Sequence, residues 1–329
     1  MDAEREVYSL PLGELIRRRP VVGDFLHSYG LEALERTLPL PAALERGELS
    51  ALGEIGLTAL DTLDLLCELL KSSETAEATS LRSLEILGGT DKDGKSENLR
   101  LQLHVGEVVS IVGPTGAGKS QLLADIECAT RGDTPTGRTV LFDGNALADE
   151  QRFALGNRLV AQLTQNMNFV IDVSVDEFLR MHARSRMLPE AEDVIESCFA
   201  TANALSGEAF DRDTRVTRLS GGQARALMIA DAACISPSPI LLIDEIENAG
   251  IDRVRAVELL RGGGKIVLLA THDPLLALSA SKRVVMRNGG IQAVLETTEA
   301  ERVRLGELIE TERKNTALRD AIRAGERIL

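Results

Sequence analysis

The chain has 329 residues, a formal net charge of −14 and 44% apolar residues, which indicates a folded protein of about two domains and excludes an intrinsically disordered one. The acidic balance argues against general binding to the nucleic-acid backbone, so no nucleic-acid partner is expected. No apolar run approaches the roughly 20 residues that span a bilayer, the N-terminus is acidic and polar, and the four cysteines form no paired pattern, so we expect a cytoplasmic protein.

Residues 1–70 are predicted to form a small helical domain. Leu12, Leu15 and Ile16 recur at helical spacing, and Pro20 is expected to end that segment. A longer amphipathic helix is predicted over 58–70, with an apolar face formed by Leu60, Leu63, Leu66, Leu69 and Leu70. Residues 71–80 are polar and lack core residues, so they are expected to form a linker.

Residues 81–295 show the pattern of an α/β domain. The segment 99–105 alternates apolar and polar residues, as a half-buried strand does. Apolar runs separated by helical stretches predict a buried, largely parallel sheet, and these runs are Val108–Val112, Val140–Phe142, Leu241–Ile243 and Ile266–Leu269. Residues 296–329 are charged and are predicted to form a C-terminal helical extension. Its apolar docking stripe is interrupted over 310–316 and consists of Leu305, Leu308, Ile309, Leu318, Ala321 and Ile322.

A glycine-rich sequence follows the predicted strand 108–112 and opens a predicted helix, which is the context of a phosphate-binding P-loop. Its glycines let backbone N–H groups turn toward phosphate oxygens, and the helix dipole adds favourable charge. Lys119 is expected to reach the β- and γ-phosphates, and Ser120 is expected to bind Mg²⁺. The residues predicted to bind nucleotide here are Gly113, Pro114, Thr115, Gly116, Ala117, Gly118, Lys119 and Ser120.

Two carboxylates stand at the end of the predicted strand 240–243, where α/β sheets place their ligands. Asp244 is expected to hold Mg²⁺, directly or through water. Glu245 is the candidate for polarising the attacking water in phosphoryl transfer. An acidic pair at a strand end is often only a solvated turn, but the upstream P-loop favours the catalytic interpretation.

The most discriminating motif is Leu219-Ser220-Gly221-Gly222-Gln223, which precedes the two carboxylates. Ser220 and the backbone amides of Gly221 and Gly222 are expected at a helix N-terminus, which would make a second site for an anion. Together with the P-loop and the acidic pair, it resembles the signature of the ATP-binding cassette (ABC) superfamily, and the resemblance covers roughly residues 81–292. The resemblance implies a P-loop NTPase of ABC type, with a parallel-sheet core, an antiparallel β subdomain and a helical subdomain, preceded here by the small all-α domain.

The resemblance also implies roles for single residues. The signature residues Ser220, Gly221, Gly222 and Gln223 would serve the γ-phosphate of ATP bound to another subunit. The working unit is then a head-to-tail dimer, either a homodimer or a heterodimer with a second ABC ATPase subunit. By position, Gln165 resembles the glutamine that contacts Mg²⁺ and the attacking water, and His272 the histidine that contacts the γ-phosphate. The expected catalytic residues are Glu245, His272 and Gln165, and the expected Mg²⁺ ligands are Ser120, Gln165 and Asp244.

Two departures from the family pattern stand beside these matches. The family usually stacks adenine on an aromatic residue before the P-loop, but residues 81–98 contain no aromatic, so the preference between ATP and GTP stays open. Glu245 is followed by Ile246 rather than proline, and the segment from Glu247 to Asp252 carries one residue more than the common pattern. That segment is expected at the dimer seam.

The stretch 12–31 resembles a short helical domain of unknown function that often precedes redox and metal-cofactor proteins. That domain typically continues with a Gly-Cys pair, whereas Glu32 follows Leu31 here. A protein-docking module is therefore favoured over a metal-binding one.

Two purposes are weighed for an ABC-type ATPase of this kind. The main interpretation is a soluble or peripheral ATPase that binds Mg-ATP at a dimer interface and hydrolyses it to change the conformation of a partner, such as a soluble enzyme or metalloprotein. The added N-terminal domain, the acidic charge and the altered seam favour it. The alternative is the nucleotide-binding subunit of an ABC membrane transporter with a separate permease chain, which the transporter-like segment 173–179 favours. Its expected location is the cytoplasm, or the inner face of the membrane as a peripheral protein.

Overall fold

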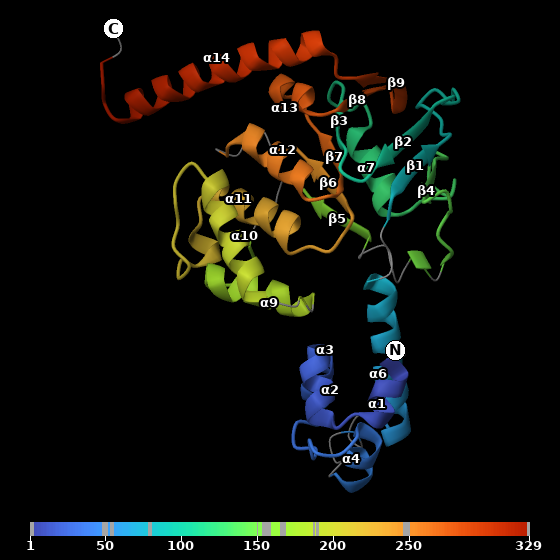
Figure 1. Ribbon diagram of the computed structural model, residues 1–329. Coiled ribbons are helices and arrows are strands. Elements are labelled where there is room, and N and C mark those ends of the chain that lie inside the picture. Colours follow the sequence, from blue (N-terminus) through green and yellow to red (C-terminus); the bar gives the residue numbers. More distant parts are fainter. Residues whose placement is uncertain are drawn as a thin grey trace. The chain divides into compact units, whose positions relative to one another are not determined.

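The computed structural model describes residues 3–47, 52, 56–77, 81–149, 151–152, 159–164, 169–186, 188, 191–245 and 251–327. The chain forms two compact units, Met1–Ser80 and Leu81–Leu329, each with its own hydrophobic core (Figure 1). The first unit is all-α, and the second carries both sheets. Among the described helices, none combines the length and the apolar character that crossing a bilayer requires.

The first unit is built from α1 (Ala3–Ser9), α2 (Leu12–Arg18), α3 (Pro20–Ser28), α4 (Leu40–Arg46) and the longer α6 (Ala59–Glu77). Leu12 and Leu15 are buried in its core, as their helical spacing predicts. The helix α2 ends just before Pro20, and Pro20 itself begins α3 because its fixed φ suits the first turn of a helix.

The long helix α6 differs from its prediction in one residue of its apolar face and at its C-terminal end. Leu60, expected on the apolar face, is 66% exposed, whereas Leu63, Leu66 and Leu70 are buried. The helix also continues to Glu77, so most of the segment expected to be a linker is helical. Polar composition alone did not mark a break here, because this segment contains no proline or glycine to end a helix.

The second unit contains two sheets. The larger sheet has six strands in the order β5 (Val160–Leu163), β6 (Ile240–Asp244), β7 (Ile266–Ala270), β3 (Val108–Val112), β8 (Lys282–Arg287) and β9 (Gly290–Glu296). Its strands pair in parallel except for the β8–β9 hairpin. The smaller sheet is antiparallel, with three strands in the order β2 (Arg100–His104), β1 (Ser83–Leu87) and β4 (Thr139–Phe142).

One apolar run lies in a different sheet from the one predicted. The run 140–142 forms β4 of the antiparallel sheet, not a strand of the parallel core. Its side chains alternate between buried and half-buried, whereas those of β6 and β7 are buried almost throughout. This one-sided burial is typical of antiparallel sheets, and the same alternation correctly predicts β2.

Each face of the larger sheet is covered by its own layer (Figure 1). Leu242 and Leu268 point into a core shared with α7 (Lys119–Glu127) and with the antiparallel sheet. Leu241 and Leu269 point into the opposite core, which is shared with α11 (Gly221–Cys234), α12 (Arg253–Gly262) and α13 (Pro274–Ser279). Because neighbouring residues of a strand face opposite sides, this alternation separates α7 from α11.

A helical subdomain follows β5 along the chain. It consists of α9 (Val175–Ser185), α10 (Ala191–Leu205), the 3₁₀ turn η1 (Val216–Arg218) and α11, and it has its own core. The helix α9 begins with a capping box, in which the Ser174 hydroxyl accepts from the N–H of Glu177 and the Glu177 carboxylate accepts from the N–H of Ser174.

The C-terminal helix α14 (Glu299–Arg323) packs on α13 and extends past it (Figure 1). It is continuous, so the interruption expected in its docking stripe over 310–316 does not break the helix. Only the first part of the apolar stripe is partly buried: Leu308 is partly buried, whereas Leu318 and Ile322 are exposed.

Candidate active site

The P-loop lies between β3 and α7, as the sequence predicts. Gly118 has φ of +100°, and a Cβ at this position would meet the Cα of Gly289 at 2.9 Å, so the site requires glycine. Lys119 begins α7 and is only 9% exposed. Its Nζ donates to the carbonyl of Gly113 at 2.9 Å and to that of Pro114 at 3.4 Å. The loop thus curls around a cation at a helix N-terminus, an arrangement suited to binding phosphate.

A cavity of about 650 Å³ opens beside this loop, within the range of small-ligand sites. Glu245 and the P-loop segment 115–120 line it together, so two of the predicted parts of the site meet here. The rest of its lining was not predicted, and it consists of Thr90, Asp91, Lys92, Gln121, Pro135, Thr136 and Gly289.

Two of the predicted Mg²⁺ ligands are in direct contact. Ser120 Oγ donates to Asp244 Oδ2 at 3.0 Å, which joins the first turn of α7 to the end of β6. A hydroxyl and a carboxylate beside a phosphate-binding loop suit Mg²⁺, which takes one or two protein oxygens and completes its shell with phosphate and water. The residues present therefore fit this metal.

Glu245 and His272 come together from neighbouring strands. Glu245 follows β6 with φ of +51°, a conformation that residues other than glycine rarely adopt, and its N–H donates to the carbonyl of Ala270 at 3.1 Å. His272 follows β7, and its Nδ1 lies 3.9 Å from Glu245 Oε1. The two side chains are 59% exposed for the histidine and 30% for the glutamate, so both reach solvent. Backbone strain at a carboxylate that lines a cavity is characteristic of functional sites.

The signature residues form the beginning of α11. Ser220 Oγ accepts from the N–H of Gln223 at 3.3 Å, and the N–H of Ser220 donates to Gln223 Oε1 at 2.9 Å. This capping box leaves the amides of Gly221 and Gly222 at an open helix N-terminus. None of the four residues lines the cavity beside the P-loop, and α7 and α11 cover opposite faces of the sheet. The structure therefore separates the signature from the P-loop of its own chain.

Gln165 and the seam residues 246–250 lie outside the described residues, so their expected contacts stay predictions. The described strand β5 ends at Leu163 and pairs in parallel with β6. Parallel strands end at the same edge of a sheet, so β5 ends at the edge that carries Asp244.

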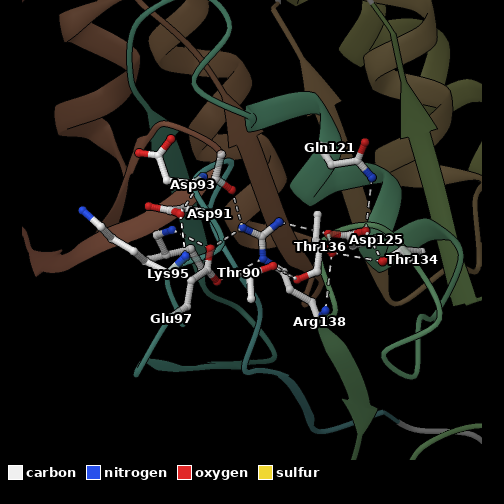
Figure 2. A network of polar contacts seen from close by, with 12 residues as sticks. Thr90, Asp91, Asp93, Lys95, Glu97, Gln121, Asp125, Thr134, Thr136 and Arg138 are labelled. Atoms are coloured by element: carbon white, nitrogen blue, oxygen red, sulfur yellow. Dashed lines mark hydrogen bonds and ion pairs between the residues drawn. The ribbon is translucent and has the colours of Figure 1, made fainter.

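A buried ionic network is centred on Arg138 (Figure 2). The guanidinium of Arg138, which is fully buried, donates to Glu97 at 2.5 and 3.1 Å and to Asp125 at 3.0 Å. Burial lowers the pKa of Arg138, but hydrogen bonds and charges from Glu97 and Asp125 outweigh it and hold that pKa above its ordinary value. Glu97 precedes β2 and Asp125 lies on α7, so the arginine fastens the antiparallel sheet to the P-loop helix.

The network reaches the wall of the cavity. Asp125 accepts hydrogen bonds from Gln121 Nε2 at 3.2 Å and from Thr136 Oγ1 at 2.9 Å, and both donors line the cavity. Sequence reasoning missed the network because its members lie up to 41 positions apart and no local pattern marks them. The only signal was an ionisable residue, Asp125, within the otherwise apolar face of a predicted helix.

The loop between β1 and β2 also reaches the P-loop. Lys92 Nζ donates to the carbonyl of Gly116 at 2.9 Å, and Thr90 and Asp91 line the cavity beside it. No aromatic side chain is among the described residues that line the cavity. A polar loop precedes the P-loop here, whereas the family usually has an aromatic residue that stacks on adenine.

Comparison with known proteins adds an independent observation. A family model described as ABC transporter matches residues 96–248. The ABC transporter ATP-binding protein MJ0121 of Methanocaldococcus jannaschii is 49% identical over 249 residues, which are 75% of this chain and 95% of that protein. The lipoprotein-releasing system ATP-binding protein LolD of Bordetella pertussis is 30% identical over 211 residues, covering 59% of this chain and 86% of LolD. The dimeric MJ0796 cassette, solved bound to ADP and Pi, shares the fold with a TM-score of 0.51 at 23% identity, over 65% of this chain and 99% of that one.

The predicted fold class is confirmed, with a parallel core, an antiparallel sheet, a helical subdomain and a preceding all-α unit. The resemblance of the N-terminal unit to a domain of redox proteins stays a prediction. Since the P-loop, the acidic pair and the signature helix stand in this fold, and a relative matches over nearly its whole length, the chain belongs to the ABC transporter family as an ATPase that binds ATP with Mg²⁺.

Proposed function

We propose that this chain is the nucleotide-binding subunit of an ABC transporter, in which two such subunits close around two ATP molecules and drive a separate permease chain. The observation that carries the proposal is an exposed apolar segment at the start of the helical subdomain. Support also comes from the names of the relatives, which are ATP-binding proteins of an ABC transporter and of a lipoprotein-releasing system.

The exposed segment begins with a residue that packs against the helical subdomain. The ring of Phe169 packs edge-on against Phe178 of α9, with ring centroids 5.0 Å apart. The next two side chains nevertheless face solvent, with Val170 97% and Ile171 41% exposed, and Met181 on α9 is 45% exposed. Apolar side chains held at the surface by an ordered neighbour are characteristic of a docking surface for another protein.

In hydrolysis, each of these residues would have its own role. Lys119 and the P-loop amides would hold the β- and γ-phosphates, and Ser120 with Asp244 would hold Mg²⁺, which when bound offsets phosphate charge. Glu245 would accept the proton of the water that attacks the γ-phosphorus, as ADP leaves. His272, 3.9 Å from Glu245, would donate to the γ-phosphate and stabilise the charge that develops on it.

The separation of the signature from the P-loop supports a shared site. Because Ser220 and the amides of Gly221 and Gly222 do not reach the P-loop of their own chain, they would complete the site of a second protomer. Each closed dimer then holds two ATPs, in a head-to-tail arrangement. The MJ0796 cassette, which shares the fold, is dimeric with ADP and Pi bound.

A second candidate is a soluble or peripheral ATPase that acts on a protein partner through the N-terminal unit. Two leucines of α6 favour it, since Leu60 is 66% and Leu65 36% exposed on a unit with its own core. In the first candidate the protein lies in the cytoplasm at the inner face of the membrane, and in the second it does not require a membrane partner.

Purification of the protein from membrane and soluble fractions of its own cells distinguishes the two candidates. The transporter proposal expects an integral membrane protein in stable proportion, lost in Val170→Asp but kept in the matched surface variant Leu60→Asp, with ATPase activity unchanged in both. A soluble partner that is lost in Leu60→Asp and kept in Val170→Asp would contradict the transporter proposal and support the second candidate.

A further inference from the structure

A chain of charged side chains attaches the C-terminal helix to the loop that carries His272. Glu312 Oε1 of α14 accepts from Arg253 Nη2 at 2.6 Å, and Arg253 Nη1 donates to Asp273 Oδ2. The side chains are partly shielded, with exposed fractions of 33% for Glu312, 21% for Arg253 and 11% for Asp273. Because these side chains are partly buried, water and salt screen their attraction less than they screen that of a fully exposed ion pair.

Asp273 is also the residue that fixes the backbone next to His272. Its Oδ1 accepts from the N–H of Leu275 at 2.7 Å and so caps α13, while its own N–H donates to Thr271 Oγ1 at 3.0 Å. Thr271 is buried, and its N–H donates to the carbonyl of Ile111 in β3 at 3.1 Å. His272 therefore stands between two anchored residues, so the backbone that carries its ring is held in part through Asp273.

Arg253 brings a second functional segment into this contact. It is the first residue of α12, and the residue before it, Asp252, caps that helix by accepting from the N–H of Arg255 at 3.1 Å. The segment expected at the dimer seam ends at Asp252. One guanidinium thus joins the end of that segment to the His272 loop, and Glu312 holds the guanidinium from α14.

We propose that Glu312 and Arg253 are positioning residues for ATP hydrolysis, through which α14 holds the His272 loop in its working place. None of Glu312, Arg253 and Asp273 lines the nucleotide cavity, so we expect the chain of contacts to affect turnover rather than ATP binding. A partner that draws α14 away from α12 would slow hydrolysis while leaving the bound nucleotide in place. This inference rests on the role proposed above for His272.

The test compares two neutralised glutamates on the same helix. Glu312→Gln removes the negative charge that pairs with Arg253, whereas Glu307→Gln removes the charge of an exposed pair with Arg304, in which the two side chains are 58% and 72% exposed. We expect Glu312→Gln to lower kcat by about twofold to fivefold, in keeping with the size of partly exposed ion pairs, with KM for ATP unchanged. Glu307→Gln is expected to leave both constants unchanged. Equal kinetics for the two variants, or a rise in KM without a fall in kcat, would overturn the inference.

A double variant separates positioning from general damage. In a His272→Ala background, measured by single-turnover hydrolysis, Glu312→Gln is expected to cause no further loss, because its effect passes through the histidine. A further loss of the same factor would overturn the positioning role. A wild-type rate for His272→Ala would overturn the proposed role of His272 and this inference with it, whereas a slowed His272→Ala beside an unaffected Glu312→Gln overturns this inference alone.

Discussion

Arg138 combines a full positive charge with complete burial, and it has two carboxylates, Glu97 and Asp125, as partners. Such a group contributes less net stability than its contacts suggest, because all three charges have left water. Its removal is costly for a different reason: the two carboxylates would stay buried without a cation. Arg138 therefore holds the antiparallel sheet against the P-loop helix.

For Arg138→Met we expect a loss of about 3–5 kcal/mol in the free energy of unfolding of the full chain, measured with urea. The matched variant is Arg131→Met, whose partner Asp149 lies 2.6 Å away with side chains 39% and 66% exposed. It is expected to cost less than about 1 kcal/mol. Similar small losses in both variants would show that the buried network is not coupled to stability as described.

The cavity makes a prediction about the base of the nucleotide. Stacking on an aromatic side chain is worth about 1–3 kcal/mol per base, and none is among the described residues that line this cavity. Because polar residues such as Thr90, Asp91 and Lys92 line this cavity instead, we expect kcat/KM for ATP and GTP to lie within about tenfold of each other. A preference for ATP above about a hundredfold in steady-state assays would contradict this expectation.

At the scale of elements, α14 is held at its first turn as well as at Glu312. Glu301 caps the helix through the N–H of Thr298 at 2.8 Å and pairs with Arg283 of β8. The Thr298 backbone hydrogen bond and then Arg283 lower the pKa of Glu301 to about 2, from an ordinary value of 4.5. The helix is therefore held at two points along its length, at Glu301 and at Glu312.

This lowered pKa gives the anchor a defined pH dependence. The folded carboxylate stays charged where the unfolded one takes up a proton, so its stabilising effect is complete above pH 4.5 and is lost as the pH falls toward about 2. The difference in Tm between the wild type and Glu301→Gln is therefore expected to be largest near neutral pH and to shrink below pH 4.5. A difference that stays constant across that range would contradict the assignment.

The elements differ in how far the sequence could predict them. The strict alternation of 99–105 correctly predicts β2, and the glycine-rich stretch correctly predicts the strand–loop–helix around Lys119. The run 140–142 was assigned to the wrong sheet, because three apolar residues carry no information about their partner strand. The continuation of α6 to Glu77 is compatible with a segment that lacks proline and glycine, and α14 runs unbroken through 310–316 with ion pairs along its surface.

The site could be predicted where its residues form short motifs or, as for His272, match the family pattern by position. Ser120, Asp244 and Glu245 belong to short motifs, and the structure places them at the same sheet edge. Arg138 and Lys92 belong to no motif and reach the site through tertiary contacts over long separations. Least could be predicted about the function of the N-terminal unit, because its leucine-rich core contains no motif of catalytic or ligand-binding residues.

In the proposed dimer, each whole molecule carries two incomplete half-sites. The cavity holds the P-loop and Glu245, and the signature helix begins on the other side of the sheet. ATP would then bind more tightly to the closed dimer than to the monomer, which is the differential affinity that closure requires. Hydrolysis would remove that difference and reopen the pair.

The most direct measurement is the molecular mass of Glu245→Gln in solution with and without Mg-ATP, by light scattering after size exclusion. The shared-site account predicts a monomer without nucleotide and a stable dimer holding two ATPs with it, because binding is kept while hydrolysis is lost. The same variant carrying Ser220→Arg is predicted to bind ATP and stay monomeric. A Glu245→Gln protein that binds Mg-ATP and remains a monomer would contradict the account.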